Sequence, residues 1–242
     1  MLVRMIPILK ALIVVLAVAL AVVAAALVRF AVVGNRGGTP RTQLERGIVA
    51  AEQAVKADPQ NAPARVKLAA AYLEGNSVDA ALEQARYAVK LAPERPEGYY
   101  ILGLVKSAKG SMNEAIAALQ KSAATKGQTA PFYQDVYAAL AQVQEKAGNR
   151  KAAIVALNSA LDKGPENSLL LFELGRLYER DAQWLPALDS YATALQFVPD
   201  YEEARQAFDR LSKAHPDAAK TLKQARNPKP TQKQSGSTRP GK

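Results

Sequence analysis

Residues 168–201 read SLLLFELGRLYERDAQWLPALDSYATALQFVPDY. The positions that define the pattern in this stretch are Leu174, Gly175, Tyr178, Ala187, Tyr191, Ala194 and Pro199. The first three share one face of a helix, because residues one and four apart lie close together on a helical surface. The next three recur at helical spacing in a second helix, and the proline stops that helix. The stretch predicts two antiparallel helices that approach closely through small side chains.

The same pattern occurs three times upstream. The first copy uses Leu68, Ala69, Tyr72, Ala81, Ala85, Ala88 and Pro93, and the second, 34 residues on (68 to 102), uses Tyr99, Leu102, Gly103, Gly110, Ala115, Leu119 and Ser122. The third copy is displaced by 38 residues (102 to 140) and uses Tyr137, Leu140, Ala141, Gly148, Ala153, Leu157, Ala160 and Pro165. Repetition of one supersecondary unit predicts a stack in which each unit packs against its neighbours.

This unit resembles the tetratricopeptide repeat (TPR). The resemblance covers about 42–214 and implies an all-α, right-handed α-solenoid of about ten helices, whose first helices line a groove that binds other proteins. The expected full repeats lie near 62–95, 96–129, 134–167 and 168–201. An N-terminal half-repeat near 42–57 should precede them, and a C-terminal capping helix is expected at 202–214.

Turn and cap residues agree with this division. The residues expected to close the four hairpins are Asn76, Gly110, Gly148 and Ala182. Prolines at 63, 96 and 131 fall in expected first turns, where a missing N–H costs little. Thr42 and Glu45 form a predicted capping box at the start of the half-repeat.

Residues 11–28 contain no charged or strongly polar side chain. These 18 residues (28 − 11 + 1) would span about 27 Å as a helix, close to the roughly 30 Å hydrocarbon core of a bilayer. The sequence predicts a short N-terminal tail at 1–10, a transmembrane helix at 11–33 and a linker at 34–41. Two alternatives remain open: a buried core helix, and a secretory signal peptide that is cleaved near Ala24–Ala26.

The orientation of this segment is ambiguous. Two basic residues precede it and four follow it up to Arg46, so the count of basic residues alone favours a cytoplasmic solenoid. Short-tailed N-terminal anchors, however, generally export the domain that follows. We expect a single-pass membrane protein with an extracytoplasmic solenoid, and the opposite topology stays open.

The net charge of +10 is concentrated at the two ends of the chain. Residues 1–46 hold six basic and one acidic side chain, and residues 213–242 hold eight basic and one acidic. A nucleic-acid-binding domain normally carries its positive charge on the folded surface. The distribution therefore argues against nucleic acid as a partner of the solenoid.

The segment 215–242 is expected to be a basic, mostly disordered tail. Its last part, 227–242, has no bulky apolar residue whose burial could offset the cost of ordering. Its cations are Lys220, Lys223, Arg226, Lys229, Lys233, Arg239 and Lys242. This density predicts a salt-sensitive contact with an anionic surface such as lipid, nucleic acid or a wall polymer. A tail that only improves solubility is the alternative.

Few residues offer catalytic or metal-binding chemistry. The chain has no cysteine and a single histidine, His215, which excludes thiolate nucleophiles and Cys/His zinc sites. No Gly-rich phosphate loop or Gly-x-Ser-x-Gly elbow occurs. We expect neither cofactor nor catalysis, and we expect His215 to serve the negative end of a helix dipole. Two function classes remain: a partner-binding scaffold for an envelope complex, and an adaptor that acts through its basic tail.

The outward-facing positions of the expected first helices predict the partner-binding groove: Val66, Ala70, Leu73, Tyr100, Leu104, Gln142, Leu169, Phe172 and Arg176. Most are apolar, which favours an extended or helical segment with large apolar anchors. The variant of the resembled fold that grips a terminal carboxylate places Lys, Asn and Arg along its groove. Here much of the comparable surface is occupied by Val66, Ala70, Ile101 and Leu104, which argues against that mode of binding. Tyr100 and Phe172 are the predicted hot spots. Packing of these residues between helices or under the half-repeat is the alternative.

Overall fold

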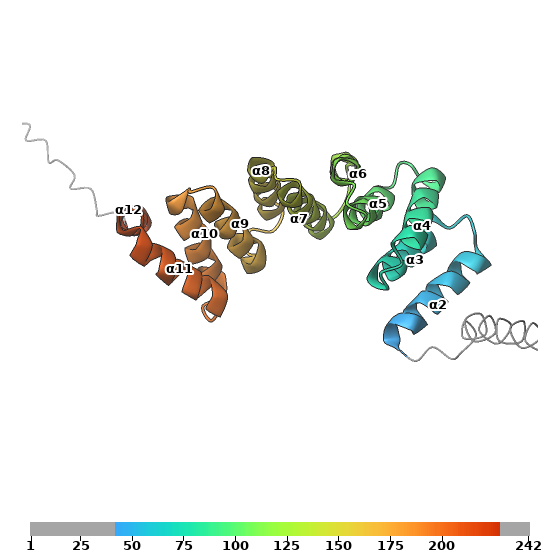
Figure 1. The fold of residues 1–242 in the computed structure, drawn as a ribbon, viewed down its shortest axis with the longest axis horizontal. Coiled ribbons are helices and arrows are strands. Elements are labelled where there is room, and N and C mark those ends of the chain that lie inside the picture. The colour runs from blue at the N-terminus through green and yellow to red at the C-terminus, as the bar shows by residue number, and fades with distance from the viewer. Residues whose placement is uncertain (1–41, 228–242) are drawn as a thin grey trace, which may run out of the picture. The chain divides into compact units, whose positions relative to one another are not determined.

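The computed structural model describes residues 42–227. This range forms eleven helices and no strand: α2 (Gln43–Ala57), α3 (Ala62–Glu74), α4 (Val78–Leu91), α5 (Pro96–Ala108), α6 (Met112–Ala124), α7 (Ala130–Lys146), α8 (Arg150–Leu161), α9 (Ser168–Arg180), α10 (Trp184–Phe197), α11 (Glu202–Ala214) and α12 (Pro216–Arg226). Figure 1 shows them following one another in chain order. The predicted all-α, repeat-built fold is confirmed.

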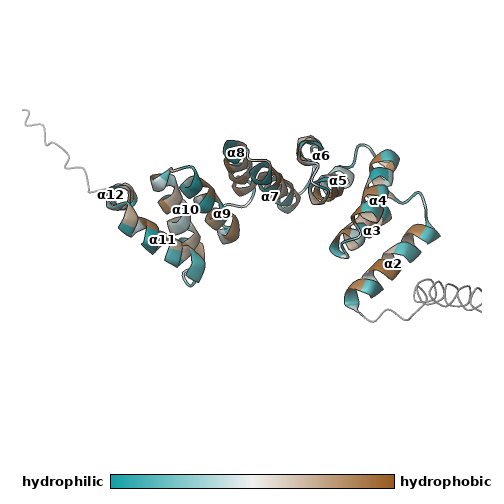
Figure 2. Cartoon of the chain, viewed as in Figure 1, coloured by the Kyte–Doolittle hydropathy of each residue, from teal (hydrophilic) through white to brown (hydrophobic). Residues whose placement is uncertain are grey.

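The chain divides into two compact units, Met1–Ala50 and Ala51–Lys242, and α2 begins in the first and ends in the second. At the start of α2, the N–H of Glu45 donates to Thr42 Oγ1 (3.0 Å), and the N–H of Thr42 donates to Glu45 Oε2 (3.1 Å). This reciprocal pair is the predicted capping box. Hydrophobic and hydrophilic residues alternate along α2 (Figure 2), and none of its residues is buried.

In the second unit the helices pack as successive hairpins, α3 with α4, α5 with α6, α7 with α8 and α9 with α10. The second helix of each hairpin also packs against the first helix of the next one. The apolar residues that mark the repeat form the core, with Ala81, Ala115, Ala153 and Ala187 each 0% exposed. The repeat positions identified in the sequence are therefore the contacts between helices.

The turns inside the hairpins require left-handed backbone. Asn76 and Ala182 both have φ of 55°, and Gly110 and Gly148 have φ of 79° and 81°. Glycine and asparagine tolerate this region, whereas alanine adopts it at a cost. All four positions are those at which the sequence predicted the turns.

The 38-residue displacement of the third copy of the motif has a local explanation. The first helices α3, α5 and α7 begin at 62, 96 and 130, so their starts keep the 34-residue period, whereas α9 begins 38 residues later at 168. Helix α7 has 17 residues against 13 in α5. The four additional residues form about one helical turn before the repeat motif. The repeat expected near 134 therefore starts four residues earlier.

The predicted tail boundary at residue 215 is wrong, because residues 216–226 form α12. Pro216 occupies the first turn of this helix, and Leu222, 5% exposed, packs into a cluster with Leu188 and Leu211. One large apolar residue and a favourable helix start are enough to order a segment that otherwise reads as polar. The C-terminal cap is thus a pair of helices, α11 and α12.

Within residues 42–227, no helix is both long and apolar enough to cross a membrane. The predicted N-terminal tail, transmembrane helix and linker, 1–41, lie outside the described residues.

Candidate functional site

Each repeat begins with a first helix: α3, α5, α7, α9 or, in the cap, α11. We call the outward-facing positions of these helices the first-helix face. Of its nine predicted binding residues, Ala70, Gln142 and Leu169 are exposed. The other six are partly buried: Val66, Leu73, Tyr100, Leu104, Phe172 and Arg176. None is fully buried, so all nine keep surface that a partner could contact. Ile101, which the sequence placed on the comparable surface, is instead 3% exposed and belongs to the core.

The part of this face on α3 and α5 is apolar. Val66 and Leu73 pack beside the buried cluster of Ala69, Ile101 and Val105. A small cavity of about 220 Å³ between α3, α4 and α5 is lined by Val66 and seven neighbours, Ala62, Pro63, Lys67, Ala88, Arg95, Glu97 and Gly98. Two of the three charged members of this lining, Arg95 and Glu97, form an ion pair with each other at 3.0 Å, and the third is Lys67.

Tyr100 connects this apolar part to the third hairpin. Its ring meets that of Phe132 edge to face, with centroids 5.9 Å apart. Burial raises the pKa of the Tyr100 hydroxyl, and the nearby Asp135 carboxylate raises it further. One side of the Tyr100 ring therefore packs between helices and the rest stays accessible, and the role of Tyr100 as a binding hot spot stays a prediction.

A larger cavity, of about 430 Å³, is formed by α9, α10 and α11. Its lining combines aromatic and charged residues: Phe172, Arg176, Glu179, Arg180, Trp184, Tyr191, Ala207 and Arg210. Both Phe172 and Arg176 were predicted face residues, and the structure brings them together here. Four of the eight lining residues are charged, so the cavity is more polar than a typical small-molecule pocket.

Phe172 belongs to an aromatic group at the floor of this cavity. Its ring centroid lies 5.6 Å from that of Tyr191 and 5.3 Å from that of Tyr201. Pairs at such distances stabilise each other by about 0.5–1.5 kcal/mol beyond their buried area. The Phe172 ring is thus held in place before any partner binds.

Glu179 links the three helices around the cavity. Its carboxylate accepts hydrogen bonds from Arg210 Nη1 and Nη2 at 2.6 and 2.9 Å and from the Tyr191 hydroxyl at 3.0 Å. The Arg210 guanidinium holds the pKa of Glu179 below its usual range, and the Tyr191 bond acts in the same direction. Burial, followed by the bond to Glu179, raises the pKa of Tyr191. This contact fixes the cap helix α11 to the last full repeat.

Replacing Glu179 by glutamine should lower the free energy of unfolding by about 1 kcal/mol at neutral pH, because a charged acceptor is lost. The depressed pKa of Glu179 means that its contribution is present above the unfolded-state value of about 4.3 and is lost as pH falls through the folded-state pKa. Thermal melts of both proteins at several pH values test this. The two melting temperatures should differ at pH 7 and converge in acid, whereas a constant difference would contradict the assignment.

The remaining cavity cations also have carboxylate partners. Arg176 Nη1 donates to both Glu173 oxygens at 2.9 Å, and Arg180 pairs with Glu145 on α7. Arg176 uses a single nitrogen for this contact, and its side chain is 40% exposed. A guanidinium carries five N–H donors, so Arg176 can bind a further acceptor.

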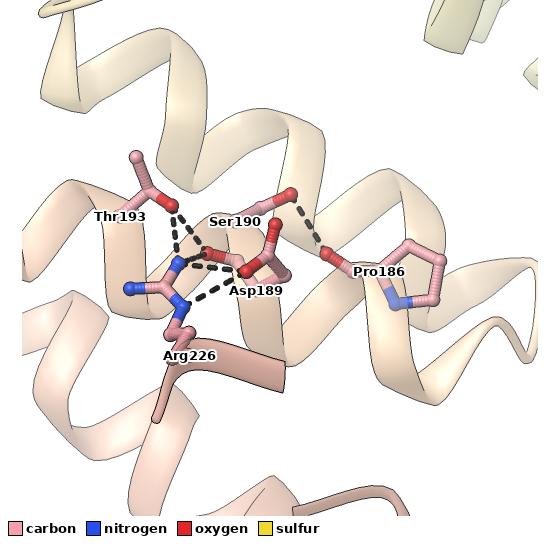
Figure 3. Close-up of polar contacts among 5 residues, drawn as sticks. All are labelled: Pro186, Asp189, Ser190, Thr193 and Arg226. Carbon is pink, nitrogen blue, oxygen red and sulfur yellow. Dashed lines mark hydrogen bonds and ion pairs between the residues drawn. The ribbon is translucent and has the colours of Figure 1, made fainter. Parts of the chain in front are cut away.

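The basic segment after the solenoid divides into two parts. Lys220, Lys223 and Arg226 lie on α12, where the lysines are exposed. Figure 3 shows Arg226 bound to α10: Nη2 donates to Asp189 Oδ1 (2.7 Å), to the Asp189 carbonyl (2.9 Å) and to Thr193 Oγ1 (2.5 Å). Arg226 thus attaches α12 to the solenoid and was wrongly grouped with the tail cations. Lys229, Lys233, Arg239 and Lys242 lie outside the described residues, and their contact with an anionic surface stays a prediction.

His215 stands between the two cap helices. It follows the last residue of α11 and precedes α12, and its ring stacks on Trp184 with centroids 4.0 Å apart and planes 10° from parallel. The position at a helix end agrees with the structural role predicted for His215. Within residues 42–227, no group of three or more His, Cys, Asp or Glu side chains is arranged to hold a metal ion.

Sequence reasoning missed four of the cavity residues that matter most: Glu179, Trp184, Tyr191 and Arg210. Tyr191 was recognised only as a repeat position, and Arg210 only as part of the expected capping helix at 202–214. Glu179 and Arg210 are 31 residues apart and meet only because α9 and α11 are neighbours in the stack. The available signal was repeat phase, since Arg176 and Arg210 are separated by one 34-residue period.

Two models of the family described as "Tetratricopeptide repeat" match the chain, one at residues 41–96 and 66–131 and the other at 134–177. No curated protein sequence matches it. Among solved structures, MamA is similar with 27% identity over 64% of this chain and 89% of that one (TM-score 0.56). Pseudomonas aeruginosa pilF is similar with 19% identity over 82% of this chain and 87% of that one (TM-score 0.63).

YrrB, described as a TPR protein with an unusual peptide-binding site, is similar with 20% identity over 72% of this chain and 88% of that one (TM-score 0.57). The family matches cover 41–131 and 134–177, which together are 135 of the 242 residues. The matched segments contain α2 to α8 and most of α9. With more than half of its length matched and with the hairpin stack present, the chain belongs to the tetratricopeptide-repeat family.

Proposed function

We propose that this protein is a non-enzymatic adaptor that binds a segment of another protein on its first-helix face. The observation that carries the proposal is the 430 Å³ cavity beside Phe172, where an aromatic floor is held rigid by neighbouring rings and charged side chains surround it. Preformed pockets of this kind accept large side chains at little entropic cost. YrrB, which has the same fold, is a protein with a peptide-binding site.

The rest of the face supports an elongated ligand instead of a small molecule. Leu169 is 59% exposed on α9, and Leu104 and Val66 keep accessible surface on α5 and α3. Apolar residues repeated on successive first helices offer several anchor points along one segment. A single cofactor-sized molecule would leave most of these positions uncovered.

Tethering to a membrane through residues 11–33, with the solenoid outside the cytoplasm, is part of the proposal. It rests on the length of the uncharged stretch in the sequence. An anchored adaptor would concentrate its partner at the membrane and so assist assembly, secretion or maturation of an envelope complex.

The chain contains no cysteine, so a single introduced cysteine can carry a blocking reagent at one chosen place. Gln142 is exposed on the first-helix face, and Gln120 is exposed on the second helix α6. We would select peptides from a phage-displayed random library on the full-length chain, and then modify Gln142→Cys or Gln120→Cys with a polyethylene-glycol maleimide. The selected peptides should lose binding to the first and keep binding to the second. Equal binding to both modified proteins would reject the first-helix face as the site.

A further inference from the structure

The equivalent positions along the first-helix face change from apolar to cationic. One position per first helix is occupied in turn by Ala70, Leu104, Gln142, Arg176 and Arg210. The spacings are 34, 38, 34 and 34, so these residues stand at the same place in successive repeats. Two small or apolar residues come first, an uncharged polar residue stands in the centre, and two arginines end the row.

Other residues of the first-helix face show the same change from apolar to charged. On α3 and α5 the face carries Val66, Leu73 and Tyr100, none of which is charged. On α9 and α11 the cavity is lined by three arginines, Arg176, Arg180 and Arg210, against one carboxylate, Glu179. Two further carboxylates, Glu173 and Glu145, approach Arg176 and Arg180 from outside the lining. The two ends of the face thus offer different chemistry to a bound segment.

The carboxylate of Glu179, which lines the cavity, already has hydrogen-bond partners within the protein. Glu179 accepts three hydrogen bonds, two from Arg210 and one from Tyr191. Arg210 remains 61% exposed and Arg176 40% exposed, and each has more N–H donors than its carboxylate partner uses. The unused donors on the two guanidinium groups favour an anionic group from a ligand, because arginine pairs with planar carboxylates in a bidentate way.

We infer that the bound segment carries apolar side chains over α3 and α5 and an acidic side chain that enters the α9–α11 cavity between Arg176 and Arg210. This inference rests on the proposed function, and it adds the chemistry of the partner. The Phe172 ring, which is only partly buried, contacts the methylene part of the acidic side chain, while the carboxylate of that side chain reaches the guanidinium groups. The partner is therefore a protein segment with clustered apolar residues followed or preceded by Asp or Glu.

The test uses the same phage-displayed random library on the full-length chain. Displayed peptides are fused at their C-terminus, so an enriched carboxylate must come from Asp or Glu side chains. We expect enriched sequences with an apolar cluster and an acidic residue at one end. A synthetic peptide with this sequence should bind about fivefold tighter at low salt than its Glu→Gln or Asp→Asn analogue, because exposed ion pairs contribute modestly and are screened.

Substitution of Arg176 tests where the acidic residue of the peptide binds. Arg176→Gln should remove the difference between the acidic peptide and its amide analogue, whereas Arg86→Gln, an exposed arginine on α4, should keep it. Face-dependent peptides without Asp or Glu, or an acidic preference that survives in Arg176→Gln, would overturn the inference and leave the proposed function intact. Peptides whose binding is insensitive to the block at Gln142→Cys would remove both.

Discussion

Leu119→Ala should lower the free energy of unfolding by about 3 kcal/mol. Leu119 is 0% exposed and lies against Gly103 on the neighbouring helix, where an added Cβ would be only 2.6 Å from its Cγ. Helices α5 and α6 approach closely at Gly103, and the Leu119 side chain fills the space between them. Truncation leaves a cavity that the rigid hairpin cannot close.

Leu169→Ala is the matched control, because the same atoms are removed from a side chain that is 59% exposed. Its effect on unfolding should stay within about 0.5 kcal/mol. Urea unfolding followed by far-ultraviolet circular dichroism measures both variants. Similar losses in the two proteins would show that the repeat positions do not form the core in the way described.

Phe172→Ala should weaken binding of a selected peptide by at least about 2 kcal/mol, close to thirtyfold. The ring forms the cavity floor and contacts both Tyr191 and Tyr201, so its removal deprives the anchor residue of its main apolar surface. These contacts are also internal, and a parallel loss of stability of about 1 kcal/mol is expected because the side chain is only partly buried.

Phe197→Ala separates the two effects. Phe197 is 46% exposed at the end of α10 and is not among the cavity residues. Calorimetric titration should show unchanged affinity for this variant, and thermal melts should show whether Phe172→Ala remains folded at the temperature of the titration. An unchanged affinity in folded Phe172→Ala would make Phe172 a packing residue only.

The fold could be predicted from the sequence because its determinants are local and repeated. The left-handed turn at Gly110 and the close approach at Gly175, where an added Cβ would lie 2.5 Å from the Tyr191 ring, each demand a particular residue type. Such requirements recur at a fixed period, so they can be recognised in the sequence. Helix α12 could not be predicted in the same way, because it has no repeat motif and is held by tertiary contacts such as those of Leu222 and Arg226.

The site was predicted only in part. Phe172 and Arg176 were identified because they occupy outward positions of a first helix. The hydrogen-bonded group of Glu179, Tyr191 and Arg210 was missed. Its members come from three helices and are joined by side-chain contacts that no local sequence pattern specifies. Repeat phase predicts which residues share a face, and the pairing of charges across helices has to be seen in the structure.

The most direct test of the central claim is photo-crosslinking from the first-helix face. Leu169→Cys on α9 and Val155→Cys on α8 would each carry a benzophenone maleimide, at residues that are 59% and 66% exposed. The full-length proteins would be irradiated with one peptide from the selection. Crosslinking from Leu169→Cys with none from Val155→Cys is the predicted result, and crosslinking that is equal from both or confined to Val155→Cys would contradict binding on the first-helix face.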